Sequence, residues 1–77
     1  MNDASITPVA ITGDTIRLGQ FLKLSGLAET GAHARERLVD NEVTVNGEAE
    51  ARRGRQLHRG DVVQLDTPKG SSRASVA

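Results

Sequence analysis

The dipeptide Asn46-Gly47 is the sequence feature that most constrains how this chain can fold. Asn-Gly between two short extended runs is the strongest short-range signal for a β-hairpin, because both residues tolerate the positive φ angles of a tight turn. The runs on either side alternate Val43 and Val45 with polar residues, as a half-buried strand does. Residues 42–51 are therefore predicted to form a hairpin.

The register of this hairpin has two solutions. A two-residue loop would place Val43 opposite Glu50, whereas a three-residue loop ending at Gly47 would place Val43 opposite Ala49. We favour the three-residue loop, with Gly47 in a left-handed bulge position, because that register pairs two apolar side chains on one face.

A short helix is predicted before the hairpin, over residues 18–25. Leu18, Phe21 and Leu22 recur at helical spacing and form one apolar face. Gly26 follows at the position where a left-handed residue commonly ends a helix. Two helical turns are too short to be stable alone, so packing must hold this helix.

A second helix is predicted to begin at Thr30, whose hydroxyl suits an N-cap. Its inner stripe contains Ala34 and Leu38, with Gly31 and Val39 beside it, and Arg35 lies at the edge of that stripe. The cap is expected to be incomplete, because His33 stands where a capping box has glutamate.

The remaining segments divide the chain into one domain and two ends. Residues 1–8 and 67–77 are expected to be disordered, because they are rich in small and polar residues. Residues 9–66 are expected to form a single domain, with a short strand at 9–11 and a last strand at 62–65. The predicted fold is α+β, with two short antiparallel helices packed on a small twisted sheet of three to five short strands. Its predicted core is Leu18, Phe21, Leu22, Leu27, Ala34, Leu38, Val43, Leu57, Val63 and Leu65.

Composition argues against most kinds of chemistry. The 77 residues contain no cysteine, and the two histidines, His33 and His58, match no metal-ligand spacing. Neither histidine has a nucleophile or carboxylate at a spacing that suggests a catalytic triad, and no glycine-rich phosphate loop is present. We therefore expect no enzyme activity, no metal and no cofactor. No apolar run long enough for a membrane span and no signal peptide is visible, so we expect a cytoplasmic location. The protein is also expected to be a monomer.

The distribution of charge is more informative than its sum, which is zero. Arg52, Arg53 and Arg55 leave the hairpin together, and residues 51–59 contain no acid. The planar guanidinium fork suits phosphate, and Gly54 lets the backbone approach a ligand closely. Helical packing could bring cations of both helices onto the same concave face. The candidate RNA-binding residues are Arg17, Lys23, Thr30, Arg35, Asn46, Arg52, Arg53, Arg55 and His58.

Each candidate also has a structural alternative. Arg17 and Lys23 would suit a solvated helix face, and Arg35 would suit a salt bridge at the stripe edge. The arginine-rich segment could be a solvated loop. Asn46 and His58 could serve only their turns.

Several motifs together resemble the small RNA-binding domain of the ribosomal protein S-four type, often called the alpha-L motif. The matching segments are RLGQFLKLSGL, ETGAHARERLVDNEVTVNG and RGDVVQL, which cover roughly residues 15–65. The chain is most similar to standalone bacterial members that carry Arg-Arg-Gly-Arg after the hairpin. It departs from the family pattern at Gly19, where many members have aspartate, and at Thr30-Gly31, where many have Ser-Arg. The first departure is expected to loosen the start of the first helix, and the second to remove one phosphate contact.

The resemblance implies binding to structured RNA, of the ribosomal or transfer RNA class, with the ribosome as one setting. With one aromatic residue in the chain, base stacking is nearly excluded, so phosphates and shape must be recognised instead. Neutralising four phosphates would give a log–log salt slope of about −3 to −4. The alternative is a protein-interaction module of the same fold, whose arginine loop meets an acidic partner.

Overall fold

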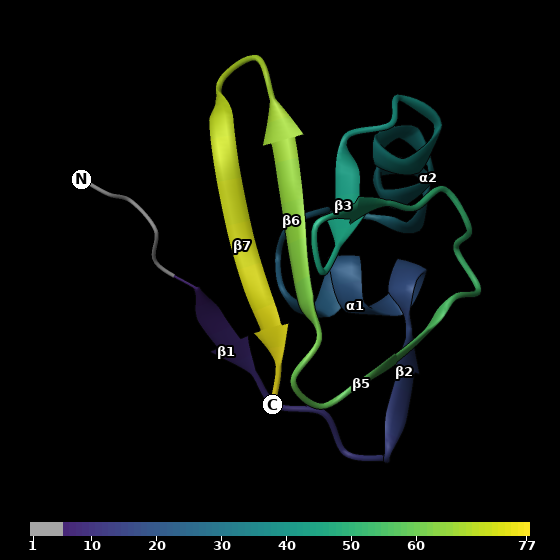
Figure 1. Cartoon of the computed structure of the whole chain (residues 1–77). Helices are drawn as coiled ribbons and strands as arrows, with labels where there is room; N and C mark the ends of the chain where they lie inside the picture. The colour runs from purple at the N-terminus through teal and green to yellow at the C-terminus, as the bar shows by residue number, and fades with distance from the viewer. Residues whose placement is uncertain (1–5) are drawn as a thin grey trace.

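The computed structural model describes residues 6–77, so the part of the predicted disordered N-terminus in residues 1–5 lies outside the described residues. Figure 1 shows two short helices beside a sheet of short strands. In chain order the elements are β1 (Thr7–Val9), β2 (Thr15–Arg17), α1 (Leu18–Leu24), α2 (Gly31–Val39), β3 (Val43–Val45), β4 (Glu48–Ala49), β5 (Gln56–His58), β6 (Val62–Thr67) and β7 (Gly70–Val76).

Five of these strands form one mixed sheet in the order β1-β7-β6-β3-β4. All neighbouring pairs in it are antiparallel except β1 and β7, which are parallel. Strands β2 and β5 form a separate antiparallel ribbon. In Figure 1 both helices lie on the same side of the β6–β7 hairpin, and α1 packs against α2. The α+β prediction is confirmed.

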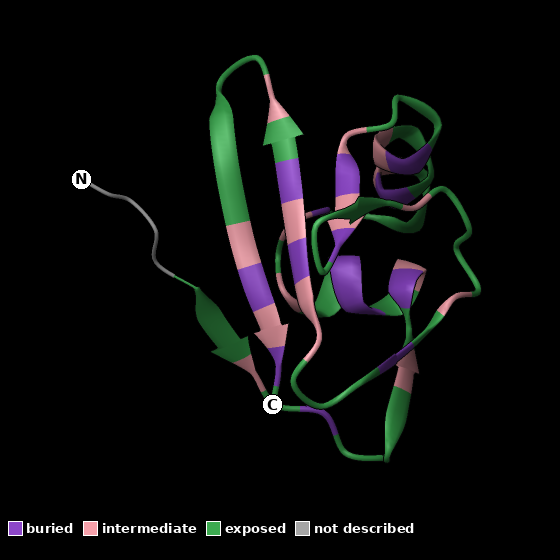
Figure 2. Ribbon diagram, in the orientation of Figure 1, coloured by how far each residue is buried: buried purple, intermediate pink, exposed green. Residues whose placement is uncertain are grey.

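The core lies between the helices and the inner face of the sheet (Figure 2). Helix α1 contributes its whole predicted face, and Phe21 is fully buried. Of the ten predicted core residues, only Leu27 is partly exposed, whereas Val39, expected beside the inner stripe of the second helix, is 69% exposed. The core also contains residues that the sequence did not single out, which are Ile11, Ala28, Val45, Ala74 and Val76.

The register of the β3–β4 hairpin differs from the favoured three-residue loop. Thr44 pairs with Ala49 and Val45 with Glu48, so the loop has two residues. Asn46 and Gly47 both have positive φ angles, 52° and 87° respectively. These angles match the tight turn whose twist suits a hairpin. Pairing apolar residues was the wrong criterion, because both residues of β4 are exposed.

The C-terminal segment also differs from expectation. Residues 67–77 were expected to be a disordered tail, but Gly70–Val76 forms β7 and pairs with β6 along six residues. Alternate side chains point inward, so that Ala74 and Val76 are each 2% exposed. The segment was not predicted as a strand because its sequence has low hydrophobicity. It nevertheless pairs with β1 and β6 and buries every second side chain near its end.

The N-terminal strand is shifted from its predicted position. It was expected at residues 9–11 after a disordered start, but β1 spans Thr7–Val9. Ile11 lies beyond this strand, where its side chain is buried and its N–H donates to the carbonyl of Ala77 at 3.1 Å. Parallel pairing with β7 thus orders residues 7 and 8, which composition alone assigned to a disordered end.

Candidate RNA-binding site

The first turn of α1 is joined directly to the arginine loop, which we define as residues 51–55. Arg17 is the N-cap of α1 but its side chain makes no capping hydrogen bond. Instead, the N–H of Leu18 donates to the carbonyl of Arg55 at 2.8 Å, and the N–H of Gly19 donates to the carbonyl of Arg53 at 3.0 Å. Two helix N–H groups that lack intrahelical partners are satisfied in this way. The arginine loop thus caps the start of α1, where glycine in place of aspartate is expected to loosen the helix.

The first turn of α2 is capped more completely than the sequence suggested. Thr30 Oγ1 accepts from the N–H of His33 at 3.0 Å, and His33 Nδ1 accepts from the N–H of Glu29 at 3.2 Å. His33 thus reaches back toward the helix start, but to the N–H of Glu29 and not to that of the N-cap Thr30, from which a capping-box glutamate would accept. The N–H groups of Gly31 and Ala32 remain without an acceptor among residues 6–77. Such free N–H groups at a helix start favour an anion.

A groove of about 310 Å³ lies where α1, the start of α2 and the arginine loop meet. We call it the cationic groove. Three of its lining side chains, Arg17, Lys23 and Arg53, are exposed cations that form no ion pair within residues 6–77. Its complete lining is Arg17, Gly19, Gln20, Lys23, Gly31, Ala34, Arg53 and Gly54. Unpaired cations beside free N–H groups make this a surface suited to phosphate.

The other two arginines of the loop, Arg52 and Arg55, donate hydrogen bonds to the carboxylate of Glu50. Arg52 donates through Nε and Nη2 to both carboxylate oxygens of Glu50, at 3.1 and 3.2 Å. Arg55 Nη1 donates to Glu50 Oε1 at 3.0 Å. The hydrogen bonds from Arg52 chiefly lower the pKa of Glu50 to about 2. The expectation of an arginine loop without a nearby acid is therefore wrong, since the acid lies one residue before the segment considered.

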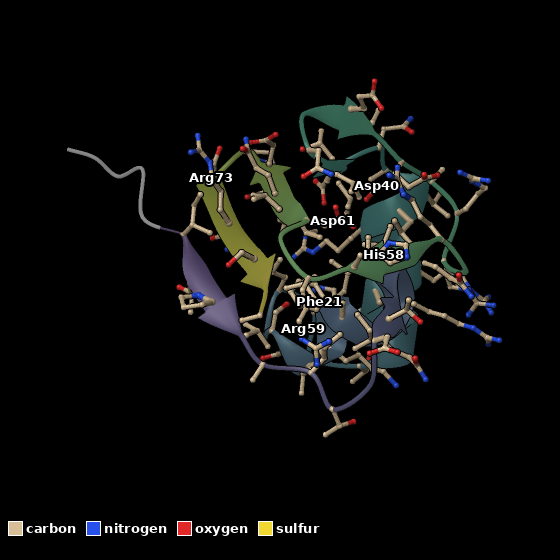
Figure 3. All side chains as sticks on the ribbon, turned by 60° about the horizontal axis from the view of Figure 1, so that its bottom comes forward. Phe21, Asp40, His58, Arg59, Asp61 and Arg73 are labelled. Carbon is tan, nitrogen blue, oxygen red and sulfur yellow. The ribbon has the colours of Figure 1, made fainter. Side chains whose placement is uncertain are left out.

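The remaining candidates do not line the cationic groove. Arg35 is exposed on α2, and Thr30 uses its hydroxyl as a cap. His58 lies on β5 near Asp61, as Figure 3 shows. The groove thus gathers Arg17, Lys23 and Arg53 and leaves out Thr30, Arg35, Asn46, Arg52, Arg55 and His58.

Asn46 is held in a closed network between two turns. Its Nδ2 donates to Asp61 Oδ1 at 3.0 Å, and its Oδ1 accepts from the N–H of Val62 at 2.9 Å. The other oxygen of Asp61 accepts from the N–H of His58 at 2.8 Å. This backbone hydrogen bond is the main reason why the pKa of Asp61 is lowered. Both the Nδ2 and the Oδ1 atom of Asn46 form hydrogen bonds within the protein, so this side chain holds the two turns together.

Sequence reasoning missed two kinds of participant. Gly19, Gln20, Gly31 and Ala34 line the groove as small or neutral residues, so no charge pattern marks them, whereas Gly54 was expected at a ligand site. Glu50 was counted with the hairpin rather than with the loop. A signal for the contact between α1 and the arginine loop was available, because α1 begins at Leu18 after an arginine that makes no capping hydrogen bond, so its first N–H groups need acceptors from another segment.

Within residues 6–77, no group of three or more His, Cys, Asp or Glu side chains is placed to hold a metal ion. Neither of the two helices in this range has the length and apolar character of a membrane span.

Comparison with known proteins identifies the family of this chain. A family model described as S4 domain matches residues 9–71. This chain belongs to the S4 domain family. A Bacillus subtilis (strain 168) protein named "Probable ribosome maturation protein RlbA" is 46% identical over 59 residues, which cover 77% of this chain and 83% of that protein. The resemblance inferred from the motifs is confirmed, and family membership indicates RNA binding.

Proposed function

We propose that this protein is a non-catalytic RNA-binding protein that holds structured RNA by its phosphate backbone in the cationic groove. The observation that carries the proposal is the meeting of two segments around one hollow: Arg17 at the N-cap of α1, Lys23 of α1 and Arg53 of the arginine loop are three cations without an ion pair in residues 6–77. Arginine and lysine at a protein surface normally find carboxylates or face open solvent. Here they converge beside free helix N–H groups, which suits successive phosphates.

The proposed RNA is ribosomal. A relative whose name refers to ribosome maturation covers most of this chain and supports that setting. It also supports a cytoplasmic location. Transfer RNA would present a similar backbone, so the two RNAs are to be compared directly.

The number of cations in the groove predicts how RNA affinity depends on salt concentration. Three unpaired cations, rather than the four phosphate contacts assumed from the sequence, would give a log–log slope of about −2 to −3. Sequence preference should be weak, because backbone contacts carry no base information.

The test uses two double variants that match in residue type and charge. Lys23→Ala with Arg53→Ala removes two groove cations, whereas Lys69→Ala with Arg73→Ala removes two cations of the β6–β7 hairpin. Binding is measured by fluorescence anisotropy to a labelled hairpin fragment of ribosomal RNA, to a transfer RNA and to an unstructured RNA of the same length. The groove variant should bind the ribosomal hairpin about thirtyfold more weakly, since each lost bond to a charged group is worth about 1.5 kcal/mol or more without full additivity.

The hairpin variant should bind like the wild type. Equal losses in both variants would show that overall charge, not the groove, attracts RNA. Tighter binding to the unstructured RNA would contradict recognition of RNA structure, and tighter binding to transfer RNA would contradict the ribosomal assignment. An affinity for polyglutamate equal to that for RNA would favour the protein-interaction alternative.

A further inference from the structure

Glu50 is the most heavily hydrogen-bonded side chain near the cationic groove, although it does not line the groove. Its carboxylate accepts five hydrogen bonds, and its side chain is only 9% exposed. Two come from the backbone N–H groups of Ala51 and Arg52, each at 3.1 Å. The other three come from the guanidinium groups of Arg52 and Arg55. One carboxylate thus fixes both the backbone and the side chains of the arginine loop.

The loop is fixed again from the other side by α1. The carbonyls of Arg53 and Arg55 accept the N–H groups of Gly19 and Leu18. Arg53 is held through its carbonyl by one of these contacts, and it is the arginine of the loop that lines the groove. Its own side chain makes no ion pair within the described chain, so its placement depends on the backbone that carries it.

This arrangement divides the arginines of the loop by role. Arg52 and Arg55 have their charge partly balanced by Glu50, whereas Arg53 retains its full charge for a ligand. A carboxylate near a site for a polyanion is unfavourable by charge alone. Its presence is accounted for if a fixed loop aids binding more than the negative charge hinders it.

We propose that Glu50 is a positioning residue for RNA binding, which holds Arg52 and Arg55 as a frame and thereby presents Arg53 to the groove. This inference rests on the proposed function, because it assigns a role within the same site. Glu50 remains ionised far below neutral pH, since the hydrogen bonds from Arg52 keep its pKa at about 2. The frame is therefore complete under all conditions in which RNA binding would be measured.

The test distinguishes the effect of losing the loop contacts of Glu50 from the effect of losing one negative charge. Glu50→Gln and Glu48→Gln each remove one negative charge from the same hairpin, but Glu48 is exposed and makes no side-chain hydrogen bond within residues 6–77. If charge alone matters, both variants should bind the ribosomal RNA hairpin equally or more tightly than wild type. We expect Glu50→Gln to bind about three- to tenfold more weakly, the factor for ordering one long side chain on binding, while Glu48→Gln binds as well as wild type or better.

A second readout separates a local change in the loop from general loss of structure. In NMR spectra of the free proteins, the amide signals of Leu18 and Gly19 should shift in Glu50→Gln and stay in place in Glu48→Gln. The ring signals of buried Phe21 should be unchanged in both. If Glu50→Gln does not fold, Arg55→Gln removes the Glu50 contact from the opposite side, and the same shifts are expected.

The outcomes distinguish this inference from the proposed function. RNA binding by Glu50→Gln that equals or exceeds wild-type binding overturns the positioning role. Unshifted amides at Leu18 and Gly19 overturn the frame itself, whatever the RNA result. If the wild type binds no RNA, the proposed function fails, while the amide signals still decide whether Glu50 shapes the loop.

Discussion

Two carboxylates, Asp61 and Glu50, each close a loop of this protein, but with different partners. Asp61 accepts a backbone N–H and the amide of Asn46, which are neutral donors. Glu50 accepts from two arginines as well as from backbone. The Asn46–Asp61 network is closed on itself, whereas the Glu50 network adjoins Arg53, a cation with no partner among the described residues. The comparison suggests that unsatisfied charge beside a fixed frame marks a binding surface, and a fully satisfied network marks a structural one.

The largest stability effect is expected at the structural loop. Asn46→Ala should lower the free energy of unfolding by about 2–3 kcal/mol, because alanine is strained at a φ of 52° and both amide hydrogen bonds are lost. For a domain of this size, the melting temperature should fall by about 10–20 °C. Differential scanning calorimetry measures both quantities.

Asn46→Gly serves as the matched control, since glycine accepts positive φ but makes neither bond. It should lose about half as much stability as Asn46→Ala. The folded fraction of either variant should bind RNA as wild type does. A loss of RNA affinity at a temperature where Asn46→Gly is fully folded would break the distinction between the two loops.

A smaller effect on the free energy of unfolding is expected when the pH is lowered. A carboxyl whose pKa is lowered by folding contributes stability above its unfolded pKa, and this contribution disappears as pH falls toward the folded value. For Glu50 the window runs from 4.5 down to about 2. Urea unfolding at several pH values should therefore show stability falling through this window in wild type and Glu48→Gln, with a shallower fall in Glu50→Gln. The difference should be modest, because the Arg52 side chain is 77% exposed and solvent screens the pair.

Equal slopes in all three proteins would mean that ionisation of Glu50 adds no stability. The Asp61 carboxyl, whose pKa is also lowered, contributes to the common slope in each protein and so cancels from the comparison.

Much of the fold could be predicted because local signals agreed with tertiary packing. The apolar spacing of Leu18, Phe21 and Leu22 fixed one helix face, and Thr30 marked the start of the next helix. Strand β7 escaped prediction because its burial depends on pairing with β1 and β6, and not on the hydrophobicity of its own serines.

The candidate site was predictable in part for a similar reason. Charge and helix phase indicated Arg17 and Lys23, and both line the groove. They could not separate Arg53 from Arg52, since adjacent arginines look alike until their partners are known. Asn46 was rightly assigned first to its turn, but its bonds to Asp61 and Val62, which join segments fifteen and sixteen residues apart, appear only in three dimensions.

The link from Asn46 to the second turn also limits how the chain can vary in length. Surface turns usually tolerate inserted residues, because their backbone is free to bulge into solvent. Here the Asn46 side chain links the turn at Asn46-Gly47 to the turn at 59–61 by hydrogen bonds, which fixes the distance between the two turns. A residue added to either turn would misplace the other, so natural variants of this protein should gain or lose residues elsewhere.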